Sequence, residues 1–162
     1  MWNADKLGYR GNTNYNRAYE GDELVWEKQW PEPIPPDNEI WYTSVDDNII
    51  EQFNNNYIGV NLVSNIYENG KGVVKYDGDI LGWWNANNIG GPLQNNTMIK
   101  TIILPDSVNK FSIRTFFGCS NLMSVSIPAG LTTWKRMTIG NYSLTFFGCG
   151  SLTNITYRGT IA

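Results

Sequence analysis

The stretch "RTFFGCSNL", from Arg114 to Leu122, returns thirty residues later as "LTFFGCGSL", from Leu144 to Leu152. Both copies contain Thr-Phe-Phe-Gly-Cys followed by two other residues and a Leu. A unit that cannot bury its apolar face alone needs a neighbouring copy to cover it. The repetition therefore indicates a stack of similar structural units within this chain.

A second feature repeats with a different period. "IILP" ends at Pro105 and "VSIP" ends at Pro128, a separation of 23 residues. Each stretch begins with a Val or Ile that comes three residues after a Leu or Ile, and a third such pair occurs later in the chain. The pairs are Ile99 and Ile102, Leu122 and Val125, and Leu152 and Ile155. Internal periods of roughly 20–29 residues with this spacing predict leucine-rich repeats with one short parallel strand per turn.

The Phe-Phe-Gly-Cys segment is interpreted as the part that turns the chain and inserts an aromatic ring into the core. Counting back 23 residues from Cys119 reaches Asn96, with Leu93 in the place of Phe116. This earlier stretch is interpreted as a degenerate first copy, which gives about three turns. The predicted repeat core consists of Phe116, Cys119, Leu122, Phe146, Cys149 and Leu152.

The Phe motifs are thirty residues apart although the Pro motifs are 23 apart, so about seven extra residues lie between Pro128 and Thr145. "WKRMTIG", beginning at Trp134, is interpreted as the inserted loop. Insertions in solenoids map to loops on one face, often the binding face. Trp134, Lys135 and Arg136 are therefore candidate contacts to an acidic glycan. The alternative is that the loop packs on the solenoid or forms an oligomer contact.

Residues 99–157 resemble the BspA-type leucine-rich repeats, whose usual text is close to "FxxCxxLxxVxIPxxVxxI". "NEIWYTS", "NLVSNIYENGKGVVKYDG" and "YEGDELVWEK" also resemble segments that precede such repeats in proteins of Bacteroides and of its phages. The resemblance implies a non-enzymatic binding or scaffold module, of the kind found in surface adhesins and in phage structural proteins. The chain departs from the pattern in having about three copies, one enlarged and one degenerate.

Four segments follow from the patterns along the chain, which is expected to be mainly β. Residues 1–30 contain two alternating runs around a turn and predict a β-hairpin anchor. "PEPIPPD", residues 31–37, predicts a stiff spacer because its prolines exclude helix. Residues 38–98 predict a small β lead-in with the cap of the solenoid, and residues 99–162 the repeats with parallel strands.

The N-terminal hairpin carries more apolar surface than two strands can hide, since a lone hairpin is marginal in water. Tyr15, Tyr19, Leu24 and Trp26 are the candidate residues for docking on a larger assembly or on another copy of the chain. A free-standing decoration is the alternative. Trp83 and Trp84 are candidate glycan contacts, although covering the end of the solenoid is the favoured interpretation.

Catalysis and cofactors are not expected. The chain of 162 residues contains no His, the side chain that most often serves as general base or metal ligand near neutral pH. Its two Cys do not form a CxxC motif and no His accompanies them, so no metal site is predicted. Cys119 and Cys149 are expected to be buried free thiols, with a disulfide between adjacent turns as the alternative.

Nucleic acid and membrane are not expected partners either. The net charge is −3, and no run of basic residues is longer than the pair Lys135-Arg136. No apolar stretch approaches the ~20 residues that span a bilayer. The start "MWNADKLGYRGN" lacks the basic and apolar regions of a secretory signal.

The sequence therefore predicts a non-enzymatic attachment protein. The favoured location is a phage virion, as a head or tail fibre component held through residues 1–30 to virion or fibre proteins, as a homo-oligomer. Cell-surface polysaccharide is the candidate ligand. The alternative is a bacterial cell-surface adhesin that binds glycan or host protein, and a glycan-active enzyme is the remote third class.

Overall fold

The computed structural model describes residues 17–20, 23–27, 33–54, 59–82, 91, 93–131, 133–134 and 144–159. The chain divides into two compact units, Met1–Pro33 and Ile34–Ala162. The described part is mainly β, as the sequence predicts.

The first unit contains a hairpin of β1 (Arg17–Glu20) and β2 (Glu23–Glu27). The strands pair antiparallel, with Tyr19 opposite Leu24 and Ala18 opposite Trp26. This pairing is the one expected from the alternating runs on either side of a Gly-containing turn. Tyr15 lies outside the described residues.

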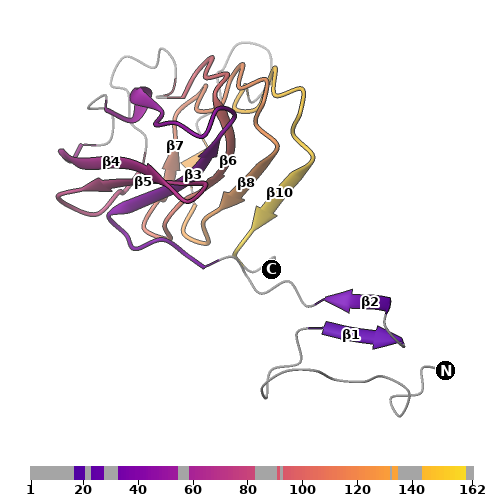
Figure 1. Cartoon of the computed structure of the whole chain (residues 1–162). Coiled ribbons are helices and arrows are strands. Elements are labelled where there is room, and N and C mark those ends of the chain that lie inside the picture. The colour runs from indigo at the N-terminus through magenta and orange to yellow at the C-terminus, as the bar shows by residue number, and fades with distance from the viewer. Residues whose placement is uncertain are drawn as a thin grey trace. The chain divides into compact units, whose positions relative to one another are not determined.

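Six of the described strands in the second unit form one sheet in the order β10-β8-β6-β3-β5-β4 (Figure 1). The strands are β3 (Glu39–Ser44), β4 (Leu62–Glu68), β5 (Lys71–Tyr76), β6 (Ile99–Ile103), β8 (Ser124–Ile127) and β10 (Asn154–Tyr157). β6, β8 and β10 are mutually parallel, whereas β3 pairs antiparallel with both β6 and β5. One sheet therefore runs from the lead-in into the repeats, and β3 pairs with the first repeat strand.

The parallel strands keep the spacing that the sequence predicts. Ile102 of β6 lies opposite Val125 of β8, which lies opposite Ile155 of β10. Ile102 and Val125 are buried. The repeated Leu/Ile-x-x-Val/Ile pattern is thus the inward-facing part of each turn, and we number the turns first (93–111), second (116–134) and third (146–159).

A shorter parallel ladder joins β7 (Lys110–Phe111) to β9 (Thr133–Trp134), with Phe111 opposite Trp134. Trp134 therefore belongs to the regular frame of the second turn, and the prediction that the insertion begins there is wrong. Phe116 follows Phe111 by five positions, whereas Phe146 follows Trp134 by twelve. The seven extra residues lie after Trp134.

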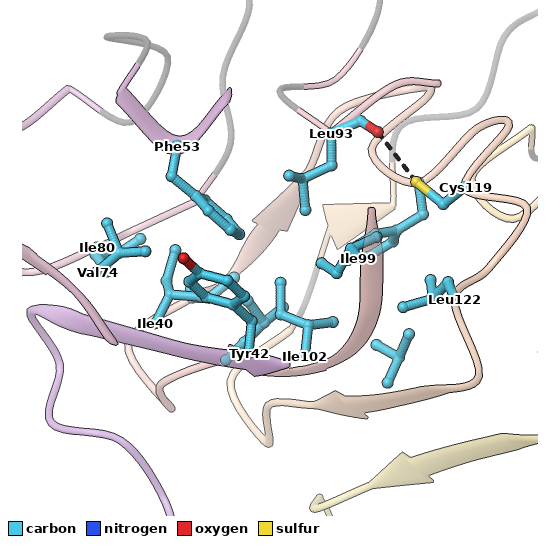
Figure 2. Packing of buried hydrophobic residues seen from close by; sticks show 14 of the residues in the cluster. Ile40, Tyr42, Phe53, Val74, Ile80, Leu93, Ile99, Ile102, Cys119 and Leu122 are labelled. Atoms are coloured by element: carbon cyan, nitrogen blue, oxygen red, sulfur yellow. Dashed lines mark hydrogen bonds between the residues drawn. The ribbon is translucent and has the colours of Figure 1, made fainter. Parts of the chain in front are cut away.

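The core lies between the inner face of the sheet and the returning segments of the chain (Figure 2). On the lead-in side, tyrosine hydroxyls fix the 3₁₀ helix η2 (Glu51–Asn54) over the sheet. The Tyr42 hydroxyl accepts a hydrogen bond from the Ile50 amide at 3.0 Å, and the Tyr76 hydroxyl donates to the Phe53 carbonyl oxygen at 3.0 Å. Burial raises the pKa of both tyrosines, so they remain neutral hydrogen-bonding groups.

The Gly of each Phe-Phe-Gly-Cys motif has a backbone role. Gly118 and Gly148 have φ of 72° and 80°, and Asn95, their counterpart in the first turn, has φ of 59°. Gly adopts this left-handed region at no steric cost, and Asn is among the residues that tolerate it best. The first copy is therefore degenerate in sequence but keeps the backbone turn of the other two.

Candidate binding face of the sheet

Hydrogen bonds between turns explain the repeated Cys. The Cys119 thiol donates to the Leu93 carbonyl oxygen, and the Cys149 thiol donates to that of Phe116, each at 3.0 Å (Figure 2 shows the first). This confirms that Leu93 occupies the place of Phe116. Both thiols are free, as predicted, but only Cys119 is buried, whereas Cys149 is partly buried. Burial raises the pKa of Cys149 and raises that of Cys119 to about 12, so these cysteines are structural and not nucleophilic.

Aromatic rings stack along the same line. Phe116 and Phe146 lie 5.3 Å apart between ring centroids with planes 2° from parallel, and Phe117 and Phe147 lie 5.4 Å apart at 16°. Of the predicted repeat core, Phe116, Cys119 and Leu122 are buried, whereas the third-turn residues are partly buried against the same cluster. The third-turn residues are Phe146, Cys149 and Leu152.

The opposite face of the sheet is open to solvent, and β3 shows the alternation clearly. Ile40 and Tyr42 point into the core, whereas Glu39, Trp41 and Thr43 are only partly buried on the other face. Successive side chains of a strand point to opposite sides of the sheet. Trp41 is thus a large aromatic side chain on the face that does not pack against the core.

Three further apolar residues continue this face across neighbouring strands. Trp41 of β3 lies opposite Val73 of β5 on one side and Ile103 of β6 on the other, and Val73 lies opposite Ile66 of β4. Ile66 is 50% exposed, and the other three are partly exposed. We call Ile66, Val73, Trp41 and Ile103 the outer row. It crosses the junction between the antiparallel lead-in and the parallel repeats.

The Trp41 ring is held in place before any partner arrives. Its indole N–H donates to a Glu39 carboxylate oxygen at 2.9 Å, and the Lys71 ammonium lies 3.0 Å from the ring centroid. Lys75 in turn lies 3.7 Å from Glu39. Desolvation lowers the pKa of Lys71, and the nearby Glu39 carboxylate acts in the opposite direction. A fixed aromatic ring loses little conformational entropy on binding.

A hollow of about 420 Å³ lies at the β4–β5 end of the outer row. Ile66 and Val73 supply aliphatic walls, while Glu68, Asn69 and Lys71 supply a carboxylate, an amide and an ammonium group. Ligand pockets in proteins commonly combine apolar walls with a few polar groups in this way.

The outer row consists of residues other than the binding residues that the sequence predicts. Trp83, Trp84, Lys135 and Arg136 lie outside the described residues, and Trp134 is described only through its backbone in β9. Tyr19, Leu24 and Trp26 are likewise described only through the pairing of β1 with β2. Sequence reasoning missed the outer row, although the alternation of "EIWYTS" was the signal that separates Trp41 from its buried neighbours.

The described part of the chain also bears on metal binding and on membrane insertion. There, no three His, Cys, Asp or Glu side chains come close enough together to hold a metal ion. The same residues include no helix with the length and apolar character needed to cross a bilayer.

A solenoid with one short parallel strand per turn, and with an aromatic ring and a thiol at fixed places in its turns, defines a leucine-rich repeat structure. A family model described as a BspA type leucine rich repeat region of six copies matches residues 85–162. Residues 85–162 are thus a BspA-type leucine-rich repeat region, and repeats of this family are typically non-enzymatic binding domains. No curated protein and no solved structure matches the chain.

Proposed function

We propose that this chain is a non-enzymatic attachment protein that binds an extended polypeptide across the outer row. The outer row itself is the observation that carries the proposal. Trp is enriched among the residues that dominate binding energy in protein interfaces, and aliphatic neighbours exclude water around it. Trp41 lies in such a setting, between Val73 and Ile103.

Charge around the outer row suits a polypeptide with mixed polarity. Lys71 and Lys75 lie on the same face as Glu39 and Glu68, so neither sign dominates. Charged groups at the rim of an interface set its register and its on-rate more than its affinity. The apolar row would then supply the affinity and the flanking charges the alignment of the partner.

The location that we propose is a phage virion, with residues 1–30 as the anchor and the repeat unit facing outward. Support comes from the division of the chain into Met1–Pro33 and Ile34–Ala162, which suits separate anchoring and binding roles. A bacterial cell surface is the alternative. Antibodies against the chain, tested by immunogold labelling on purified particles and on intact cells, separate these locations.

Selection of a random twelve-residue peptide library on the immobilised chain tests the binding proposal. We expect selected peptides to bind the chain and to lose about 2 kcal/mol of affinity with Trp41→Ala. Leu81→Ser is the matched control, because Leu81 is a large exposed apolar residue outside the outer row, with 59% of its surface accessible. Peptides that bind the Trp41→Ala variant as well as the parent would contradict the proposal.

A further inference from the structure

The third turn of the solenoid has two core positions that are exposed. Ile155 is 49% exposed and Tyr157 is 44% exposed. Their counterparts in the second turn, Val125 and Ile127, are 0% and 4% exposed. These positions are therefore buried in the second turn, where the third turn stacks on them. They are exposed in the third turn, where none of the described residues covers them.

The backbone of β10 is open on the same side. The amides of Asn154 and Arg158 donate to carbonyl oxygens of the preceding turn at 3.1 and 3.0 Å. Because the N–H groups of a strand point alternately to its two sides, those of Ile155 and Tyr157 point away from β8. β10 thus presents donors and acceptors at an edge of the six-stranded sheet.

The two edges of this sheet differ in their protection. β4, at one edge, contains a bulge between Leu62 and Ser64 and ends in Glu68, both of which hinder pairing with another strand. β10, "NITY", has no bulge against β8, no proline and no charge. In residues 144–159 the one charged side chain is Arg158, which is 8% exposed and paired with Asp106.

We infer that β10 pairs antiparallel with β10 of a second copy of this chain, around a two-fold axis that joins the two sheets end to end. A neutral edge meets its own copy without charge repulsion, and a two-fold interface needs only a self-complementary surface. Head-to-tail stacking is blocked, because β3 already pairs with β6 at the other end of the repeats. The pairing covers Ile155 and Tyr157 and leaves the outer row of each copy open, so it is independent of the proposed function.

Sedimentation equilibrium of the full chain over a range of concentrations tests this inference. We expect a dimer of twice the 18.4 kDa chain mass. Ile155→Lys should weaken the dimer by about tenfold or more, since an edge lysine opposes strand pairing. Ile66→Lys is the matched control, because Ile66 is 50% exposed on the opposite edge strand and should leave the dimer unchanged.

Hydrogen exchange provides a second readout on the parent chain alone. The amides of Ile155 and Tyr157 should exchange more slowly as the protein concentration rises, whereas amides on the β4 edge should not change. If Ile155→Lys failed to fold, as judged by circular dichroism, this measurement would decide. A monomer at every concentration, or a dimer that Ile155→Lys leaves intact, would overturn the inference.

Discussion

Arg158 in the third turn forms an ion pair with Asp106 in the first turn. Its Nε and Nη2 atoms lie 3.1 and 2.7 Å from one Asp106 carboxylate oxygen, and its Nη1 donates to the Ser126 hydroxyl of the second turn at 2.7 Å. By register, Arg158 occupies the place of Pro105 and Pro128 in the earlier turns. One side chain thus ties three turns together on the outer side of the sheet.

Breaking this ion pair should destabilise the solenoid. In the parent chain the Arg158 side chain is 8% exposed and that of Asp106 is 40% exposed. Asp106→Ala removes the carboxylate that is paired with the Arg158 guanidinium. Loss of one partner of a fully buried pair costs about 3–5 kcal/mol, so we expect about 1–3 kcal/mol here. Urea unfolding measures the change in free energy. Lys75→Ala, which removes the more exposed pair with Glu39, is the control and should cost less than about 1 kcal/mol.

The left-handed glycine of the repeat gives a second prediction. Gly148→Ala should cost about 1–2 kcal/mol, because its φ of 80° disfavours a Cβ atom. Gly118→Ala should cost at least as much, since its φ is 72° and the Asn95 side-chain oxygen, 2.3 Å from the added Cβ, must move away. Gly150→Ala is the control, because nothing lies within 4 Å of its added Cβ. Equal stability of all three variants would contradict this role for the motif.

The ring stack predicts an order of stability losses. Phe116 is fully buried, and Phe116→Ala should cost about 3–5 kcal/mol. Phe146 is only partly buried against the core, so Phe146→Ala should cost about 1–3 kcal/mol. Thermal unfolding of the two variants checks the order. A larger loss for Phe146 than for Phe116 would show that the third turn is covered more fully than the second.

The free thiols give a prediction about reactivity and pH. Burial raises the pKa of Cys119 to about 12, so iodoacetamide should modify it far more slowly in the folded chain than in urea. Folding favours the neutral form of this thiol. Its contribution to the free energy of unfolding is therefore complete below the unfolded pKa of about 8.5 and falls as the pH rises toward 12. Unfolding measured with and without reductant should agree, because the structure contains no bond between Cys119 and Cys149.

The sequence predicts the repeat frame well because its determinants are local. The parallel register of Ile102, Val125 and Ile155 and the equivalence of Leu93 with Phe116 follow from spacing alone. The free thiols were expected from the resemblance to the BspA-type repeats, and the structure has both cysteines free. The sequence pattern misplaces the start of the insertion, because it assigns Trp134 to the inserted loop. Trp134 instead pairs with Phe111 in the β7–β9 ladder, which no repeated sequence motif marks.

The outer row could not be predicted in the same way. Its residues come from strands far apart in the chain, and only the antiparallel pairing of β3 with β6 brings Ile103 beside Trp41. The Arg158–Asp106 pair likewise joins residues 52 positions apart. A period of 23 or thirty residues identifies which segments stack as repeats. It does not reveal which strands of the lead-in extend the sheet.

The binding role of the outer row is tested most directly by nuclear magnetic resonance with a selected twelve-residue peptide. The Trp41 indole N–H, which donates to Glu39, is a reporter within the row. We expect the peptide to shift the signals of Trp41, Ile66, Val73 and Ile103 and to leave those of Leu81 and Phe147 unchanged. Shifts confined to residues away from the outer row, with an unmoved Trp41 indole signal, would contradict the proposed binding face.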